Sequence, residues 1–461
     1  MEKRYNSLIW LFIVTILFYL PLTTSDVLYR DDIIRSINNF TGWWWMGRPA
    51  SDYLWRVISI GDIAPIMQPL PGLMSIALLV LSVYFLYLSY EKFAGPCSYI
   101  YFTPLLISPY LLQNMSYQYD NITMFLPLSL SYFSAAFLFK EKWYSWCIFS
   151  ASIFISLSFY QMVVNVFVVI SLFYMTVYII KNNSLPIKNT IFIAMAFIIA
   201  MIIYKLLVID IFVTSTKTQM VGSFSEVFGN IQRSISKIKM AFSSAEEIAL
   251  AAIAIFSFLS ILSFRISYVN KSILALLLIA STQFIYGPFI LLTIGVVDAR
   301  QFMSFGAILF LFIMIASHTK FLGKPTKLLV ILLTICFTVT SYKYTSALKN
   351  QYSYEKMMSF NIAQKLSENF SLNDEIFIQG HFRFTPQANH VTWNNPLIKD
   401  MMQRNSWYPR MLISSFYKGR VRIDWDNGYM PEKTVNDGVI IYSNQDFTIS
   451  KIEGKNIVLI K

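Results

Sequence analysis

The chain has 461 residues, of which 56% are hydrophobic, 17% are aromatic and only 13% are charged. A soluble globular domain carries about 25% charged residues, so this composition excludes a soluble enzyme and indicates a protein that crosses a membrane several times. A formal net charge of +12 can indicate nucleic-acid binding, so the positions of the charged residues along the chain have to be considered.

Apolar segments approaching the roughly 20 residues needed to cross a bilayer recur along the chain. We predict about eleven transmembrane helices, near residues 7–24, 70–90, 97–113, 122–139, 143–158, 162–180, 190–209, 248–264, 272–297, 301–317 and 327–341. With the amino terminus in the cytoplasm, the cytoplasmic loops hold eleven basic residues against three acidic ones, whereas the short loops opposite hold one basic residue, Arg300. This asymmetry follows the positive-inside rule, so the net charge is a topology signal and predicts no nucleic-acid partner.

The first long outer loop, residues 25–69, surrounds three consecutive tryptophans with charged residues. Apolar residues at helical spacing on both sides of the tryptophans predict short amphipathic helices at the membrane surface. The tryptophans themselves are typical of the interfacial belt of membrane proteins.

The strongest constellation of this loop is Asp31-Asp32, which lies between Arg30 and Arg35. A carboxylate can take the proton of an acceptor hydroxyl, and arginines can grip and neutralise a leaving phosphate. The same residues can equally cap a helix amino terminus and contact lipid headgroups. Residue types alone leave these two interpretations even.

The second long outer loop, residues 210–247, contains one apolar stripe at helical spacing and basic residues on the other side. It predicts a surface helix that seals the bundle.

Residues 342–461 change composition sharply. A helical pattern over 356–369 and strand patterns over 375–380, 439–442, 447–449 and 457–460 predict a small α+β domain. We therefore divide the chain into a transmembrane module, 1–341, and a carboxyl-terminal domain, 342–461, outside the cytoplasm.

Common motifs of soluble enzymes are absent from the sequence, which contains no P-loop, no G-x-G-x-x-G and no G-x-S-x-G. The predicted cytoplasmic loops are short, so any chemistry belongs to the outer face or the membrane. The three cysteines and three histidines are scattered without metal-ligand spacing.

Further short motifs follow the acidic pair in a fixed order: Gly47-Arg48-Pro49 before the second span, Ser116-Tyr117-Gln118-Tyr119-Asp120, Tyr160-Gln161, and Asp298-Ala299-Arg300 before the tenth span. The ordered set resembles the Gtr-type O-antigen glucosyltransferases, serotype-converting enzymes often carried by temperate bacteriophages. The resemblance covers the whole chain at the level of topology and spaced motifs.

The resemblance implies a C-type glycosyltransferase fold in the bacterial inner membrane, with its active site facing the periplasm. The implied donor is a polyprenyl-phosphate sugar, typically undecaprenyl-phosphate glucose, and the implied acceptor is an O-antigen repeat unit of lipopolysaccharide on its lipid carrier. A lipid-linked donor needs a membrane groove, and its phosphate needs cations at headgroup level. No cofactor is indicated, and whether a divalent metal bridges the phosphate stays open.

Candidate site residues follow from the motifs. The catalytic candidates are Asp31, Asp32 and Asp120; the donor-phosphate candidates are Arg30, Arg35, Arg48 and Arg300; the sugar-binding candidates are Trp43, Trp44, Tyr119, Tyr160 and Gln161. Structural alternatives stand beside them. Asp120 can cap a helix, Arg300 can pair with Asp298, and the tryptophans can serve as interfacial anchors.

Two other functions fit an outer-face membrane protein. An O-antigen polymerase or ligase would use a polyprenyl-diphosphate oligosaccharide, and we would expect its largest outer loop in the second half of the chain. A lipid-linked sugar flippase or transporter would place charges at mid-membrane and show repeat symmetry between its halves. The chain shows neither pattern clearly.

Overall fold

The computed structural model describes residues 2–213, 220–293, 298–402, 407–422, 438–452 and 454–461. The chain forms two compact units, which are described separately. The first unit comprises residues 1–24 and 40–342, and the second comprises residues 25–39 and 343–461.

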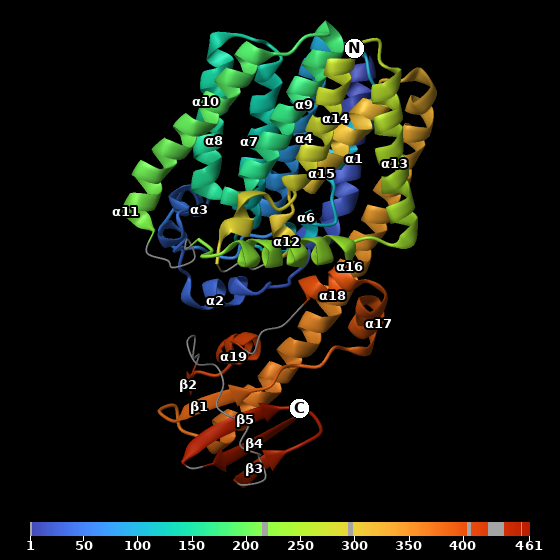
Figure 1. Cartoon of the computed structure of the whole chain (residues 1–461). Helices are drawn as coiled ribbons and strands as arrows, with labels where there is room; N and C mark the ends of the chain where they lie inside the picture. Colours follow the sequence, from blue (N-terminus) through green and yellow to red (C-terminus); the bar gives the residue numbers. More distant parts are fainter. Residues whose placement is uncertain (1, 214–219, 294–297, 403–406, 423–437, 453) are drawn as a thin grey trace. The chain divides into compact units, whose positions relative to one another are not determined.

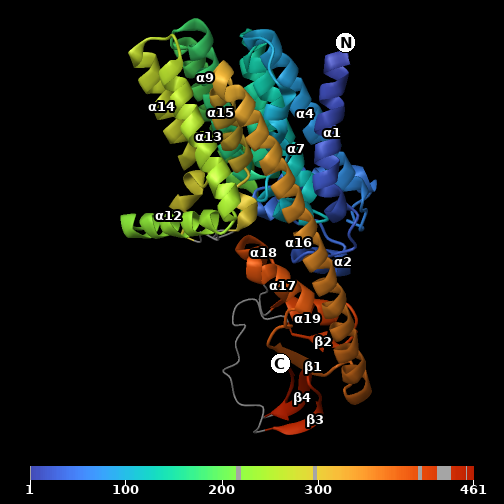
Figure 2. The same cartoon turned by 90° about the vertical axis from the view of Figure 1, so that its right-hand side faces the viewer.

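The first unit is a bundle of long helices that run side by side (Figures 1 and 2). They are α1 (Glu2–Thr23), α4 (Leu70–Ala94), α7 (Asn121–Leu138), α8 (Trp143–Phe159), α9 (Val164–Asn182), α10 (Ile187–Tyr204), α13 (Ser244–Ser263), α14 (Tyr268–Gln283), α15 (Phe305–Ser317) and the first part of α16 (Lys320–Asn369). Large apolar side chains such as Ile198, Leu262 and Leu328 are exposed on these helices. An exposed apolar surface of this kind is what a lipid-facing helix presents.

Seven of the described helices are long and apolar enough to cross a membrane, and α8 and α15 are apolar but shorter. The expectation of a membrane-embedded helical protein with a small carboxyl-terminal sheet therefore agrees with the structure. The number of about eleven spans stays a prediction, as does the C-type fold.

One predicted span is wrong as a continuous helix. Residues 97–113 were expected to cross as one segment, but they form η2 (Tyr99–Phe102) and α5 (Thr103–Leu106), followed by α6 (Leu111–Ser116). Pro104 and Pro109 lie in this segment, where the helix is interrupted. Every residue from Ile100 to Phe125 is buried. Broken backbone is tolerated at membrane depth only where protein surrounds it, and this burial supplies that surrounding.

The predicted span 272–297 is also shorter than expected. The helix α14 ends at Gln283, and the chain continues into the 3-10 turn η6 (Gly287–Leu291). Residues 294–297 of that prediction lie outside the described residues.

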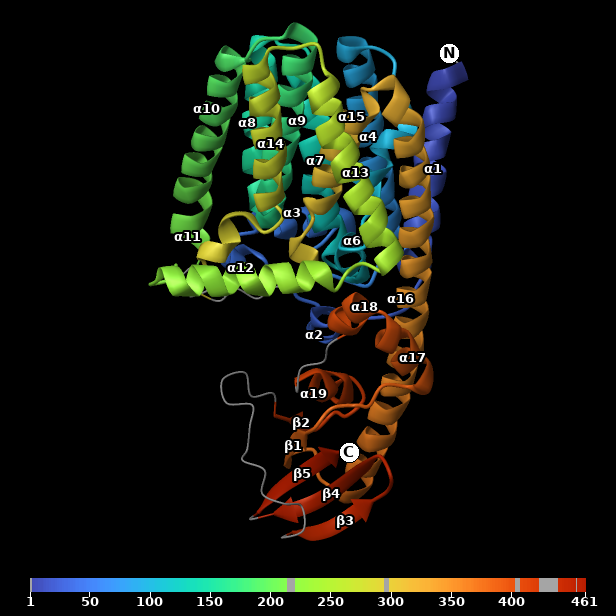
Figure 3. The ribbon, with the colours of Figure 1, turned by 45° about the vertical axis from the view of Figure 1, so that its right-hand side comes forward.

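Short elements gather at the end of the bundle opposite the amino terminus (Figures 1 and 3). They are η1 (Trp44–Met46), α3 (Pro49–Ser59), η3 (Gln161–Val163), the π turn η4 (Lys205–Ile209), α11 (Asp210–Phe212), α12 (Phe224–Lys239) and η7 (Ala299–Gln301). The helix α12 lies across this end of the bundle, with Asn230 and Ser234 buried. Asn230 Nδ2 donates to the carbonyl oxygen of Ile290 over 2.7 Å. The predicted surface helix in the second outer loop is therefore confirmed as a helix.

The second unit is built on a five-stranded sheet (Figure 2). Its strands are β1 (Glu375–Gln379), β2 (Arg420–Val421), β3 (Val439–Ser443), β4 (Phe447–Ile452) and β5 (Lys455–Ile460), and its shorter helices are α17 (Pro386–Asn394), α18 (Pro396–Met401) and α19 (Trp407–Ser414). The strand order is β2-β1-β5-β4-β3; β1 runs parallel to β2 and β5, whereas β4 runs antiparallel to β3 and β5. The four strands and the helix predicted from the sequence are confirmed.

The helix α2 (Asp31–Asn38) belongs to the second unit. Its Ile33 is fully buried, and the hydroxyl of the preceding Tyr29 donates to the carbonyl oxygen of Met401. From the sequence, residues 25–69 are predicted to form one outer loop of the transmembrane module. In the structure residues 25–39 are grouped with the carboxyl-terminal unit, because the buried face of α2 packs there.

Candidate active site

In the first unit, Asp120 is held by the tryptophan-rich segment. Asp120 is 4% exposed, and its Oδ1 accepts a hydrogen bond from Trp43 Nε1. The Trp43 ring stacks on Trp55 with a centroid distance of 6.3 Å and an interplanar angle of 10°. Trp55 Nε1 in turn donates to the carbonyl oxygen of Tyr119 over 2.7 Å. The two indoles therefore fix the backbone and the carboxylate at the start of α7.

Two contacts fix the side chain of Arg48, one with an aromatic ring and one hydrogen bond from its Nε. Its Cζ lies 4.7 Å from the centroid of the Tyr160 ring, and its Nε donates to Gln161 Oε1 over 3.3 Å. Among the described residues, neither terminal nitrogen of this guanidinium has a hydrogen-bond partner. These nitrogens form the edge that binds phosphate oxygens in bidentate pairs.

A glycine turn supports Arg48. Gln161 Nε2 donates to the carbonyl oxygen of Gly47 over 3.1 Å, and the Tyr204 hydroxyl donates to the same oxygen over 2.9 Å. Gly47 has a φ of 75°, and a Cβ there would lie 2.9 Å from the Tyr204 oxygen. The Gly47-Arg48 motif therefore needs glycine for conformation and for space.

Arg300 approaches from η7. Its Cζ lies 5.0 Å from the Tyr117 ring centroid, and its Nη2 lies 3.5 Å from Asp298 Oδ2. Its backbone N–H donates to Gln113 Oε1 over 2.8 Å. The ion pair with Asp298 that the sequence offered as a structural alternative is present, and both side chains are mostly buried.

Tyr160, whose ring contacts Arg48, lies in the turn between α8 and η3. Burial raises the pKa of the Tyr160 hydroxyl above its ordinary value of 10.0. The charges of Arg300 and Arg48 lower that pKa and oppose burial, whereas Asp298 and Asp120 act in the same direction as burial. Two cations and two carboxylates therefore act on one buried phenol, which stays protonated at neutral pH.

Several predicted roles change on this geometry. The interpretation of Trp43 as an interfacial anchor is wrong, because the side chain is 1% exposed and binds Asp120. Trp44 is 49% exposed, unlike its neighbour. Asp120 occupies the amino-terminal cap position of α7, as the structural alternative expects, but its side chain makes no cap hydrogen bond there.

The acidic pair Asp31-Asp32 lies in the second unit, where the two carboxylates differ. Asp32 is fully buried, and its Oδ2 accepts the backbone N–H of Tyr29 over 3.1 Å. Asp31 is partly exposed and has no partner among the described residues. The amino-terminal cap of α2 is Arg30, and no side chain caps this helix.

The two arginines of this segment also lie in the second unit. Arg30 has a φ of 48°, a strained value for a residue with a side chain, and its Cζ lies 5.2 Å from the Tyr29 ring centroid. A small cavity of about 30 Å³ is lined by Tyr29, Arg30 and Glu355, among others. Arg35 is 4% exposed. The sequence-predicted residues therefore form two groups, one in each unit.

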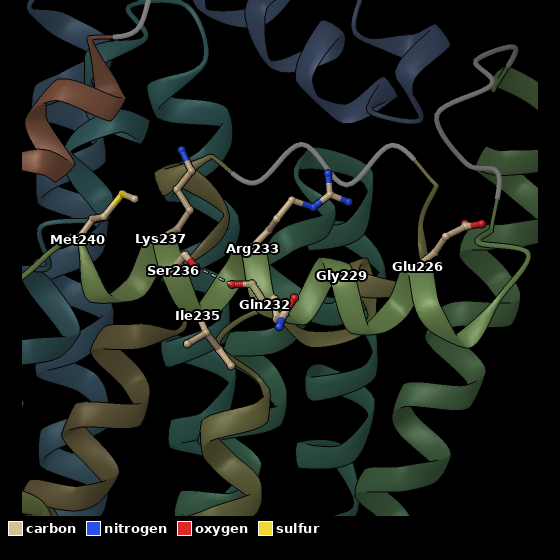
Figure 4. Close-up of a pocket in the computed structure, with 8 residues that line it drawn as sticks. All are labelled: Glu226, Gly229, Gln232, Arg233, Ile235, Ser236, Lys237 and Met240. Atoms are coloured by element: carbon tan, nitrogen blue, oxygen red, sulfur yellow. Dashed lines mark hydrogen bonds between the residues drawn. The ribbon is translucent and has the colours of Figure 1, made fainter.

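The polar side of α12 carries no predicted site residue. Arg233 and Lys237 extend to the same side of the helix, and Ile235 points the opposite way (Figure 4). These residues border an open hollow along α12. In the part of the chain that the structure describes, no three histidine, cysteine, aspartate or glutamate side chains form a group that could hold a metal ion.

Comparison with known proteins identifies the family. The sequence model of a family described as glucosyl transferase GtrII matches residues 20–311, more than half of the chain. The chain belongs to the GtrII glucosyltransferase family. The matched region contains every candidate site residue predicted from the sequence, and the Gtr-type resemblance is confirmed.

A Salmonella phage P22 protein, named as an uncharacterized 55.3 kDa protein in the gtrB 5' region, is 29% identical to the chain over 182 residues. That similarity covers 38% of this GtrII-family chain and 37% of the phage protein, so the match spans little more than a third of the relative's length. No solved structure matches the chain.

Proposed function

We propose that this protein transfers glucose from a polyprenyl-phosphate donor to O-antigen repeat units at the periplasmic face of a bacterial inner membrane. Membership of the GtrII family supports glucosyl transfer. The relative named for its place in the gtrB region of a phage supports a role in O-antigen modification. The exposed apolar helices of the first unit support a lipid-linked donor that reaches the site from the bilayer.

The observation that carries the proposal is the guanidinium of Arg48, which contacts the Tyr160 ring and Gln161 while its terminal nitrogens have no partner among the described residues. The terminal nitrogens of Arg48 are available to a ligand, and the ring of Tyr160 with Gln161 fixes their direction. A polyprenyl-phosphate sugar carries one phosphate, which becomes more negative as the sugar leaves. Preorganised guanidinium groups stabilise that developing charge.

The chemistry needs one base and one leaving-group site. An oxygen of the acceptor hydroxyl attacks the anomeric carbon of the donor sugar, the bond from that carbon to the phosphate oxygen breaks, and polyprenyl phosphate leaves with the electron pair. The hydroxyl proton passes to a carboxylate. The candidates for this carboxylate are Asp31, Asp32 and Asp120. Asp31 is partly exposed and has no partner among the described residues.

Transfer by the purified protein in proteoliposomes tests the proposal. With polyprenyl-phosphate [¹⁴C]glucose and lipid-linked O-antigen, the wild type should label the polysaccharide. Arg48→Ala should lose about 100-fold in rate, as expected when one charge-stabilising donor is removed. Arg56→Ala is the matched control, since this exposed arginine of α3 pairs, among the described residues, only with Asp62 over 3.4 Å and should retain activity. Equal rates for all three proteins, or no transfer by the wild type, would refute the proposal.

A further inference from the structure

Asp52, in α3, is a buried carboxylate without a partner. The residue is 6% exposed, and neither carboxylate oxygen has a hydrogen-bond partner in the part of the chain that the structure describes. The other buried carboxylates among the described residues, Asp32, Asp120, Glu246, Glu355 and Asp400, each have an interaction partner. Among the buried carboxylates of the described residues, Asp52 therefore differs from the others in having no interaction partner.

Packing does not explain this exception. Burying a carboxyl group without hydrogen bonds costs free energy in either protonation state, because both oxygens lose their contacts with water. Arg48, four residues earlier at the amino-terminal cap position of α3, carries the opposite charge, but the two side chains form no ion pair. A buried carboxylate and a neighbouring guanidinium that stay unpaired suit a ligand that binds both.

The position of Asp52 places it near groups that can hold a sugar. Asp52 and Trp55 are buried residues of α3, Asp52 in its first turn, and Arg48 is the residue at the amino-terminal cap position of this helix. Arg48 contacts the Tyr160 ring, and Trp55 donates to the carbonyl oxygen of Tyr119. The guanidinium of Arg48 and the carboxylate of Asp52 therefore both belong to the amino-terminal end of α3.

We propose that Asp52 binds hydroxyl groups of the sugar that is transferred, while Arg48 binds the phosphate of the same donor. This assignment rests on the proposed function and adds a determinant of sugar specificity to it. A carboxylate accepts two hydrogen bonds from neighbouring hydroxyls, so Asp52 selects donors with hydroxyls at the matching positions of the ring.

Deoxy-sugar donors measure this contact directly. Donor KM is determined for polyprenyl-phosphate glucose and its 2-, 3-, 4- and 6-deoxy analogues, with the wild type, Asp52→Ala and Asp52→Asn. For the wild type, at least one deoxy donor should raise KM by about 10- to 100-fold, the loss expected for a hydrogen bond to a charged group. For Asp52→Ala, KM for glucose should rise similarly, and the same deoxy position should have no further effect.

Two controls separate this contact from a structural role. Asp62→Ala removes an exposed carboxylate from the same loop and should leave donor KM unchanged. The melting temperature of ligand-free Asp52→Asn should equal or exceed that of the wild type, because the substitution removes a buried charge without a partner. A structural carboxylate would instead be needed for stability.

The outcomes are distinct. If no deoxy donor binds less well to the wild type, or if the deoxy effects are the same in the wild type and Asp52→Ala, the assignment of Asp52 is wrong. It is equally wrong if Asp52→Asn melts lower and keeps the wild-type KM. If the wild type transfers sugar from no polyprenyl-phosphate donor, the proposed function itself is wrong.

Discussion

At the scale of single residues, Asp31 and Asp32 show how neighbours in sequence can occupy different environments. A carboxylate that accepts a backbone N–H and is fully buried, as Asp32 is, is suited to holding the turn before α2. A partly exposed carboxylate without a described partner, as Asp31 is, is suited to taking a proton. The sequence does not rank Asp31 and Asp32 as the base. From their different surroundings we propose Asp31 for the proton transfer and Asp32 for the turn before α2.

Asparagine substitutions test this separation. Asp31→Asn should reduce transfer by about 100- to 10,000-fold, the usual contribution of a general base, with normal protein levels in the membrane. Asp32→Asn keeps an oxygen that can accept the Tyr29 N–H, so it should cost about 1 kcal/mol of stability and far less activity. Rates are measured as conversion of O-antigen, and levels by immunoblot. If Asp31→Asn is fully active and Asp120→Asn is inactive, Asp31 is not the general base and Asp120 takes that assignment.

The site residues that the sequence identified have a common physical origin. Asp120 and Arg300 are ionisable groups next to apolar spans, where charge is costly without a function or a partner, and Arg48 lies between Gly47 and Pro49 in the first outer loop, so these residues stand out in the sequence. Asp52 and Trp55 were missed because α3 resembles a surface helix in sequence. Which of its faces is buried depends on Trp43 and Tyr119, which lie elsewhere in the chain.

At the scale of elements, hydropathy located the long helices and failed where the apolar chain is broken. Segments 70–90 and 122–139 form α4 and α7 much as predicted. Segment 97–113 is also rich in apolar residues, but it contains Pro104 and Pro109 and forms η2, α5 and α6 instead of one helix. A count of apolar residues does not distinguish a helix that faces lipid from a broken segment that other helices surround.

Packing of α15 against the broken segment offers a test at this scale. A Cβ at Gly306 would lie 2.3 Å from the carbonyl oxygen of Pro104, so Gly306→Ala must push α15 away from α5. Such overpacking costs about 1–3 kcal/mol or more, and the melting temperature in detergent should fall. Gly229→Ala is the matched control, because its Cβ meets nothing within 4 Å and alanine is the better helix former by about 1 kcal/mol. Equal melting temperatures for the two variants would contradict the close contact between α15 and α5.

At the scale of the whole molecule, the distribution of basic residues predicts the orientation in the membrane. The loops that we predict to be cytoplasmic carry basic residues such as Lys140, Lys181 and Lys188. The short loops on the opposite side carry one basic residue, Arg300. A reporter that is active only outside the cytoplasm should therefore be active when fused after Lys461 and silent when fused after Lys188. The reverse pattern, measured as reporter activity at equal expression, would invert the membrane topology and place the proposed chemistry on the cytoplasmic face.

The grouping of residues 25–39 with residues 343–461 in one compact unit makes the carboxyl-terminal region a support for the acidic pair. The Tyr29 hydroxyl donates to Met401, and Ile33 of α2 is fully buried. Removal of residues 342–461 should therefore leave Asp31 without its packed surroundings. We expect the truncated protein to insert in the membrane at a normal level and to transfer no sugar.

A single substitution makes the same test without removing a domain. Tyr29→Phe keeps the ring and loses only the hydrogen bond to Met401, which contributes about 1 kcal/mol. Transfer should therefore fall partially, between the wild type and the truncated protein, when conversion of O-antigen is compared at equal membrane levels. If the protein without residues 342–461 modified O-antigen normally, the second unit would have no part in the reaction. The base would then have to lie in the first unit, where Asp120 is held by Trp43.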